Sequence, residues 1–304
     1  MPAILPRERY DAALAFVRES GRPLDVALLN HAVGEGKAEA ALVALSEFQN
    51  PDGGFGGGLE PDTQAAASSG IATSIALRLL ARLGASSRHP MVTGALGWLD
   101  ASLDRERGVW PIVPREVASA PHAPWWAWSA NLADSWNGFR FNPTAVILAW
   151  LYAYRAAAPD GLIETAEAAM RRTLAETSVI EGAYDLKCAA RLSEARDAPS
   201  DLAAPLAGLV RRSLGAHDPN DEHLSVLEIA PTPASAFGDA VAGAIEPALG
   251  ASIAGQQADG GWTMFWDWSF VDAKDWAKAK KDWRGWLTRE AIETLRAYGR
   301  VEGV

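Results

Sequence analysis

The sequence predicts an all-α protein of stacked helical hairpins, with a single domain covering residues 1–304. Three observations predict this class. Apolar residues recur with helical spacing along much of the chain, turn motifs that combine glycine with an aromatic residue recur between the helical segments, and strand patterns are nearly absent. The best strand candidate, residues 109–113, contains Pro111, which lacks the backbone donor that a sheet needs.

The helical segments carry apolar stripes at i, i+3, i+4 or i+7 spacing, which is typical of helices with one buried face. In chain order the stripes are Tyr10, Leu14 and Val17; Ile71, Ile75, Leu79 and Leu83; and Leu162, Ala166, Met170 and Thr173. Residues 145–154 are apolar on nearly every side, which indicates a helix enclosed by others.

Two turn motifs divide these helices. Residues 49–55 read Gln-Asn-Pro-Asp-Gly-Gly-Phe and residues 256–262 read Gln-Gln-Ala-Asp-Gly-Gly-Trp. We expect new helices to begin after them, at about Asp62 and Thr288. Weaker copies lie at residues 108–110 and 181–184. The glycines permit positive φ where the chain reverses, so the repetition predicts stacked hairpins.

Charge and cysteine content limit the classes of function. The net charge of −10 argues against a general nucleic-acid binder or anionic-membrane binder. Residues 1–20 are rich in charge and do not resemble a signal peptide, and the most apolar run, residues 146–154, is too short to span a bilayer. With Cys188 as the single cysteine, we expect a soluble cytoplasmic protein without a transmembrane segment.

The two good turn motifs resemble the glutamine–tryptophan repeat of squalene and oxidosqualene cyclases, which protein prenyltransferase β-subunits carry in looser form. With the two weaker copies, the resemblance covers most of residues 37–298. It implies an α/α toroid, a closed or nearly closed double ring of about six helical hairpins. It also implies an active site in the central cavity, near the start of each inner helix.

Glu60 and Asp62 are the candidate catalytic residues. They follow a run of glycines, residues 56–58, that allows close approach of the backbone to another group. Either carboxylate is suited to acid/base work or polar contacts, and burial would have to raise a pKa for one of them to act as an acid near neutrality. The alternative for Asp62 is a helix cap.

A second candidate region, residues 121–143, is long, aromatic and without clear helical register. Tryptophan rings in such a segment can pack against an isoprenoid chain, stabilise a cation or stack on sugars. The alternative is a structural role, in which the rings fill the end of the barrel. Asn142 is the expected cap of the following helix. The substrate-binding candidates here are Trp125, Trp126, Trp128, Trp136, Arg140 and Asn142.

Metal sites are the weaker hypotheses, and we expect no cofactor. The resemblance to prenyltransferases implies a possible zinc site formed by Asp185, Cys188 and either His217 or His223. The spacing between the aspartate and the cysteine is, however, one residue longer than in that family. Asp185 remains a substrate-binding candidate. Residues 217–223 are dense in ligands for Mg²⁺, yet Pro219 prevents a helix that would align them, which favours a solvated turn.

The last region, residues 262–286, interleaves tryptophan with acidic and basic residues. It is either a lid over an apolar ligand or a surface helix, residues 272–283, whose tryptophan face packs inward. Its substrate-binding candidates are Trp262, Trp266, Asp267 and Trp268.

The signatures of known reactions are missing. The sequence has no Asp-x-Asp-Asp acid motif, no aspartate-rich Mg²⁺ motif and no hydrolase or zinc-peptidase motif. The leading hypothesis is therefore an enzyme resembling terpene cyclases and prenyltransferases, with an apolar or isoprenoid-like substrate in an aromatic-lined cavity. The alternatives are a carbohydrate-active α/α barrel that takes a glycan, and a ligand-binding toroid without catalysis.

Overall fold

The computed structural model describes residues 2–128, 140–218 and 221–304, and this part of the chain is helical. It holds twelve α-helices and three short 3₁₀ helices but no β-strand, only four isolated bridges. The all-α prediction is confirmed, and Val109 forms a bridge with Asp104 instead of a strand. Trp136 lies outside the described residues.

Contacts divide the chain into two compact units, which we describe separately. Unit 1 comprises Met1–Leu45 and Ser225–Val304, and unit 2 comprises Ser46–Leu224. The expectation of one domain over residues 1–304 remains a prediction.

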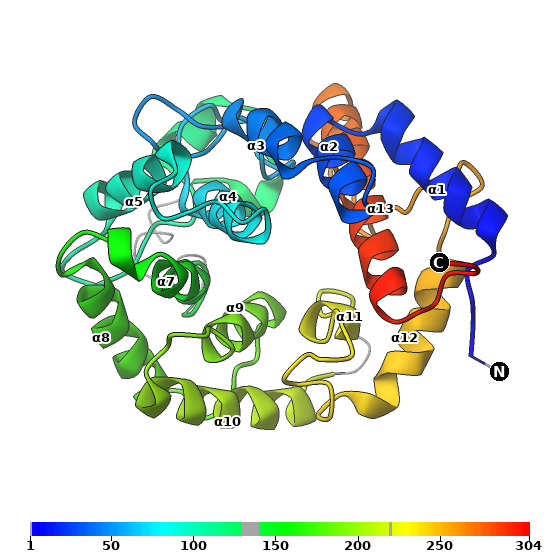
Figure 1. Cartoon of the computed structure of the whole chain (residues 1–304). Helices are drawn as coiled ribbons and strands as arrows, with labels where there is room; N and C mark the ends of the chain where they lie inside the picture. Colours follow the sequence, from blue (N-terminus) through cyan, green and yellow to red (C-terminus); the bar gives the residue numbers. More distant parts are fainter. Residues whose placement is uncertain (1, 129–139, 219–220) are drawn as a thin grey trace. The chain divides into compact units, whose positions relative to one another are not determined.

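Unit 2 arranges its helices in two rows (Figure 1). Each helix of the first row, α4, α7 and α9, contacts the next, while α5, α8 and α10 pack behind them. The bounds are α4 Gly70–Arg82, α5 Pro90–Ser102, α7 Thr144–Ala153, α8 Leu162–Ala175, α9 Ala183–Ser193 and α10 Ser200–Ala216, with 3₁₀ turns η1 Arg115–Ser119, η2 Pro124–Trp126 and η3 Arg155–Ala157.

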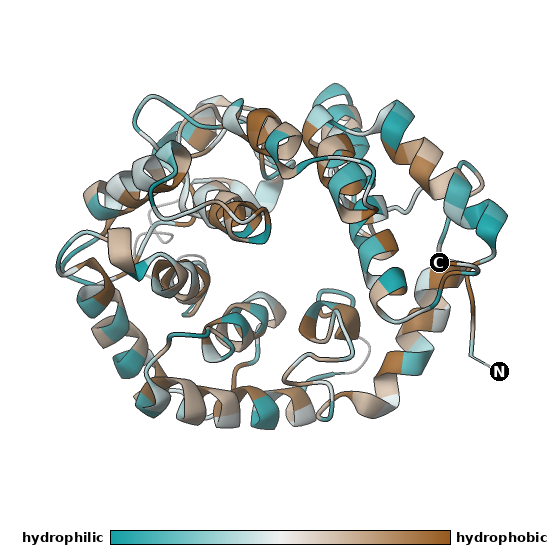
Figure 2. Cartoon of the chain, viewed as in Figure 1, coloured by the Kyte–Doolittle hydropathy of each residue, from teal (hydrophilic) through white to brown (hydrophobic). Residues whose placement is uncertain are grey.

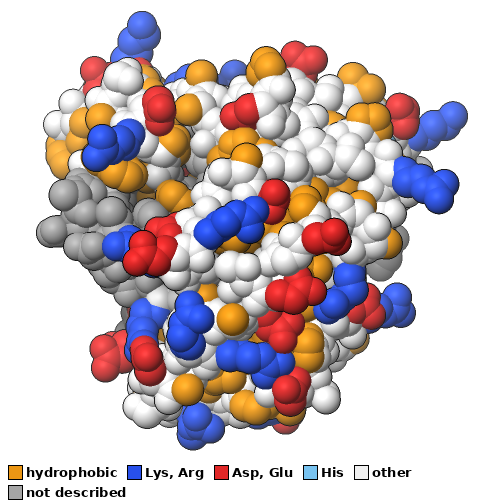
Figure 3. All heavy atoms as spheres, turned by 90° about the vertical axis from the view of Figure 1, so that its left-hand side faces the viewer, with side chains coloured by type: hydrophobic (Ala, Val, Ile, Leu, Met, Phe, Trp, Pro, Cys, Tyr) orange, Lys and Arg blue, Asp and Glu red, His pale blue; other side chains and the backbone are white. Residues whose placement is uncertain are grey.

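The apolar helix α7 contacts α4, α8 and α9, as the absence of a polar face predicts. In α8, Leu162, Ala166 and Met170 are buried, so the stripe predicts the buried face correctly. The opposite face of α8 carries charge. On the side of the molecule that Figure 3 shows, acidic and basic side chains alternate without a large patch of one sign.

Unit 1 is built around the contacts of α1 with α2 and of both with α13. Its bounds are α1 Arg7–Ser20, α2 Pro23–Ala32, α3 Ala38–Ser46, α11 Val226–Ile229, α12 Ala242–Ala254 and α13 Ala273–Ala297. The stripe of α1, which Figure 2 shows as alternating teal and brown, buries Tyr10, Leu14 and Val17 in the core of this unit.

Three predicted helix starts are wrong. The helix expected from Asp62 begins at Gly70, because the Ser69 hydroxyl accepts the N–H of Ala72 and caps it. Asn142 does not cap α7, since Pro143 holds the capping position. The helix expected at Thr288 is part of the continuous 25-residue α13, which Asp272 caps.

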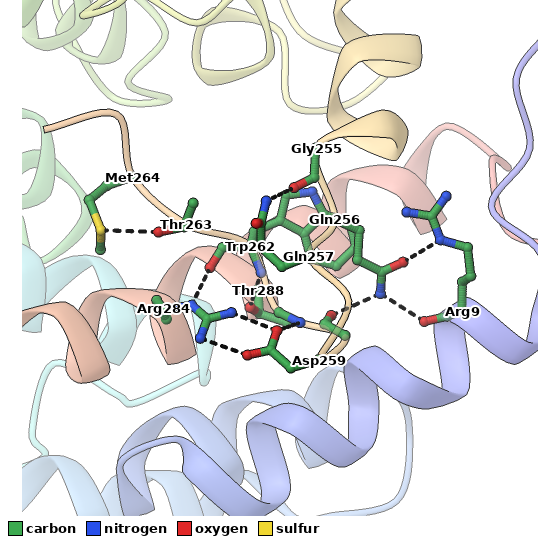
Figure 4. A network of polar contacts seen from close by, with 12 residues as sticks. Arg9, Gly255, Gln256, Gln257, Asp259, Trp262, Thr263, Met264, Arg284 and Thr288 are labelled. Atoms are coloured by element: carbon green, nitrogen blue, oxygen red, sulfur yellow. Dashed lines mark hydrogen bonds and ion pairs between the residues drawn. The ribbon is translucent and has the colours of Figure 1, made fainter.

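The two good turn motifs adopt the same conformation. In the first, Gln49 Nε2 donates to the carbonyls of Gly53 and Met91 at 2.9 and 3.1 Å. In the second, Gln256 Nε2 donates to the carbonyls of Gly260 and Arg9 at 2.8 and 2.9 Å. Figure 4 shows this second corner with its hydrogen bonds.

A threonine from a later helix completes each corner. The N–H of Phe55 donates to Thr73 Oγ1, and the N–H of Trp262 donates to Thr288 Oγ1. The weaker copy at Trp110 keeps this feature with Thr144 as acceptor. The aromatic residue of each corner is thereby fixed against the helix that follows.

Candidate active site

The candidate site begins in an extended loop between the first corner and α4. This loop folds back on itself through Gly57 N–H, which donates to the carbonyl of Ala65 at 2.8 Å. It also pairs with residues 121–123, because Gln64 N–H donates to the carbonyl of Pro121 and the carbonyl of Asp62 accepts from Ala123, each at 2.8 Å. These bonds hold Glu60 and Asp62 in fixed positions without a helix.

Glu60 is buried together with its neighbours. Its side chain is 5% exposed, and those of Asp62, Thr63 and Trp126 are 2%, 6% and 8% exposed. Trp126 comes from the turn η2, which the pairing with residues 121–123 brings over the loop. The structure thus brings three predicted site residues, Glu60, Asp62 and Trp126, together in one place.

Three buried polar atoms in this place lack a hydrogen-bond partner among the described residues. They are Glu60 Oε2, Thr63 Oγ1 and Trp126 Nε1. Buried polar atoms in folded proteins are nearly always paired, and each exception calls for an explanation. Thr63 was not predicted from the sequence, because nothing marks a threonine in an aperiodic loop.

Burial raises the pKa of Glu60 well above its usual value, and the charge of Asp62 raises it further. The nearby indole N–H of Trp126 and the backbone N–H groups of Asp62 and Thr63 act in the opposite direction. Burial and the neighbouring carboxylate dominate, so the protein favours the protonated form of Glu60 more strongly than water does. The direction of this shift is the one that a general acid at this position would need.

The void beside Glu60 is narrow. It is lined mostly by small or apolar groups and is too narrow to admit a water molecule. Its walls include Leu59, Ala72 and Pro114 in addition to Glu60 and Thr63. A ligand can therefore reach the carboxyl group only if some of these side chains move.

Asp185, a predicted substrate-binding residue, joins two segments of unit 2. Its carboxylate accepts the backbone N–H groups of Arg140, Phe141 and Asn142 at 2.8, 2.9 and 2.8 Å. Burial raises the pKa of Asp185, and the three N–H groups partly offset this effect. The side chain thus anchors the chain before α7 to the start of α9.

The remaining predicted residues of unit 2 make other contacts. The Arg140 guanidinium pairs with exposed Glu176 at 3.0 Å, and Asn142 is buried. Trp125 lies in η2, and Trp128 lies beneath the guanidinium of Arg115, 5.5 Å from the ring centre.

The predicted tryptophans of unit 1 make separate contacts. Trp262 belongs to the second corner, where its indole donates to the carbonyl of Ser252 at 2.7 Å. Trp266 packs edge-on against Trp283, and both indole nitrogens are buried without a partner in the described chain. Trp268 is buried against Trp276.

Asp267 is exposed. The hydroxyl and N–H of Ser269 lower the pKa of Asp267, and its Oδ1 accepts that N–H at 2.7 Å. The predicted surface helix exists, but it is the first half of α13.

Within the described residues, no group of three histidine, cysteine or acidic side chains is arranged to hold a metal ion. Burial raises the pKa of Cys188 to about 12, which keeps the free thiol protonated. His217 instead pairs with Asp221 at 2.9 Å. No described helix is both long and apolar enough to cross a membrane.

No protein-family model matches the chain, and no curated protein sequence matches it.

Proposed function

We propose that the chain is an enzyme with an α/α-toroid fold, resembling terpenoid cyclases and prenyltransferases, in which Glu60 is the general acid for an apolar, isoprenoid-like substrate. The fold proposal is supported by the repeated corners and by the two helix rows of unit 2. The observation that carries the site is the buried Glu60 carboxyl, with an unpaired oxygen beside the unpaired Trp126 indole.

The unpaired atoms define what the ligand must supply. A protonated Glu60 and the Trp126 indole both offer hydrogen to an acceptor, and the Thr63 hydroxyl can donate or accept. Leaving such groups buried and unpaired costs about 1–3 kcal/mol each. One oxygen-bearing group on an otherwise apolar substrate would pair with them, and Glu60 would donate its proton there.

The narrow, largely apolar lining of the void supports an apolar substrate more than a glycan. A glycan carries many hydroxyl groups that each need a partner, whereas the void is lined largely by apolar groups and admits no water. Carbohydrate hydrolysis also needs two carboxyl groups flanking the scissile bond. Glu60 and Asp62 instead lie on one loop and interact with each other.

The first test is the protonation state of Glu60. Infrared difference spectra of the wild type against E60Q at pH 7 should show a protonated carboxyl band that is absent in E60Q. In D62N the band should titrate at lower pH, because the charge that opposes ionisation of Glu60 is removed. An ionised Glu60 at pH 7 would overturn its role as the acid.

The second test is ligand binding and turnover. Native mass spectrometry of the protein from its source cells should show a bound apolar molecule. Incubation of the wild type with a panel of isoprenoid alcohols, diphosphates and squalene should give product from at least one, and E60Q should lower that rate at least 100-fold. W98F is a control, since Trp98 lies outside the site. Binding without turnover would contradict the enzyme proposal.

A further inference from the structure

A second pocket lies at the C-terminal ends of α7 and α9, two helices that contact each other in unit 2. Its volume is about 300 Å³, and it shares no lining residue with the void beside Glu60. The loop that follows α9, residues 194–197, forms one wall. This pocket has room for a small ligand, but the Trp150 Nε1 at its wall is closed to a water-sized group, so the indole ring must turn before a ligand can reach it.

One half of the pocket is apolar. Ala149, Ala153 and Ala195 leave the space open because their side chains are small, and Trp150 adds an aromatic surface. An aliphatic or aromatic group of a ligand can pack against such a surface.

The indole N–H of Trp150 also needs a hydrogen-bond acceptor. Its Nε1 is buried and has no hydrogen-bond partner in the part of the chain that the structure describes. An indole N–H can only donate. A ligand that satisfies it must carry an acceptor oxygen.

The remaining lining residues carry charges of both signs. Arg191 contacts Glu194 at 3.5 Å, longer than the roughly 2.7–2.9 Å of a charge-assisted hydrogen bond. Arg196 and Asp197 are exposed. The C-terminal ends of two helices add partial negative charge. An anion alone would meet two carboxylates and two helix ends, while a cation alone would leave the Trp150 N–H unpaired.

We propose that this pocket binds an apolar α-amino acid as its zwitterion. The carboxylate accepts hydrogen bonds from the Trp150 indole and the Arg191 guanidinium. The ammonium group faces Glu194 and Asp197, and the apolar side chain packs on the Trp150 ring and the alanines. The proposal does not depend on the function of Glu60.

Calorimetric titration with L-phenylalanine tests this site, with phenylacetate and phenethylamine as probes that each lack one charged group. We expect saturable binding of L-phenylalanine with one site per chain, and at least tenfold weaker binding of either other probe. Absence of L-phenylalanine binding at millimolar concentration, or equal binding of phenylacetate, would overturn the proposal.

Two variants connect the binding to the pocket. W150F keeps an aromatic ring but removes the indole N–H donor. It should therefore weaken binding about tenfold, as expected for a hydrogen bond to a charged group. A153L should abolish binding by filling the space, and its exposed position makes it compatible with folding. W98F should bind as the wild type does. If W150F binds as tightly as W98F, the carboxylate is not held by Trp150 and the assignment fails.

Discussion

The two glycine corners, residues 49–55 and residues 256–262, have the same backbone and different side-chain support. In both, a glutamine ties the turn to another helix and a threonine receives the N–H of the aromatic residue. The aspartates differ. Asp52 accepts the hydroxyl of Ser68 at 2.7 Å, whereas Asp259 forms a two-point ion pair with Arg284 at 2.7 and 2.8 Å.

This comparison separates what the corner requires from what it tolerates. Its geometry depends on the glycines, the glutamine and the threonine, which both copies share. The aspartate needs only to accept the N–H two residues later, at 3.0 Å in Gly54 and 3.2 Å in Gly261, so its other partner can be neutral or charged. Four sets of substitutions test this ranking.

The largest effect is expected from G53A and G260A. Both glycines have positive φ, +92° and +90°, and an added Cβ would lie 2.4 Å from the carbonyl oxygen of Gly94 or 2.5 Å from that of Ala12. Backbone strain and this clash together should lower the free energy of unfolding by about 2–5 kcal/mol. Chemical denaturation measures it.

Gly57 is the control for these two variants. It also has positive φ, +62°, but an added Cβ would meet no atom within 4 Å. G57A should therefore cost only the conformational part, about 1–2 kcal/mol. If G53A were no worse than G57A, the close contact at the corner would not matter.

Q49A and Q256A should each cost about 2–3 kcal/mol, because each removes two hydrogen bonds to backbone carbonyls. Q256A should be the worse of the two, since Gln256 Oε1 also accepts from Arg9 Nε at 2.8 Å. Thermal and chemical denaturation report the difference. Gln257, whose side chain is exposed, provides a control that should stay within about 0.5 kcal/mol of wild type. Equal losses in Q256A and Q257A would refute the shared role of the glutamine.

T73V and T288V should each destabilise the protein by about 1–2 kcal/mol. Both hydroxyls are fully buried, and their loss leaves the N–H of Phe55 or Trp262 without an acceptor. T73S keeps the acceptor and should lose less. Amide hydrogen exchange at Phe55 should accelerate in T73V but stay slow in T73S, and the reverse order would contradict the assignment.

The smallest effect is expected from D259N, which replaces the charged aspartate while keeping an acceptor for Gly261. Half of the Asp259 side chain is exposed, so the ion pair with Arg284 should contribute about 0.2–1 kcal/mol at neutral pH. Arg284 lowers the pKa of Asp259.

Since the folded-state pKa of Asp259 is the lower one, its contribution is present above the unfolded pKa of about 3.9 and is lost as the pH falls through the folded value. Denaturation curves of wild type and D259N should therefore converge at acidic pH. Curves that stay equally far apart from pH 7 to pH 3 would show that the ion pair is not the cause.

The sequence predicted the helices with strong periodicity and the location of both corners. Tyr10, Leu14 and Val17 are buried as their spacing indicates, and α7 is enclosed as its uniform apolarity indicates. It misplaced helix starts where a competing cap decided them: Ser69 in place of Asp62, and Asp272 in place of a break before Thr288. Cap preference alone does not say which of several polar residues the chain will use.

The site was predicted only in part. Glycine-rich spacing pointed to Glu60 and Asp62, and aromatic content pointed to Trp126. Nothing in the sequence indicated Thr63, or the three backbone N–H groups that occupy Asp185. The pocket beside Trp150 was also unforeseen, because it is formed by the ends of two helices about 40 residues apart in the chain.

The sequence by itself determined the helical class and the conformation of the corners, because helical periodicity and positive-φ glycine are local properties of the chain. Tertiary structure alone decided that Glu60 is buried beside Asp62 and Trp126 and that its pKa is raised. That outcome depends on the removal of water by residues 121–126, which lie about 60 positions away and pair with the loop through the backbone. Desolvation depends on everything that surrounds a group, so no local pattern encodes it.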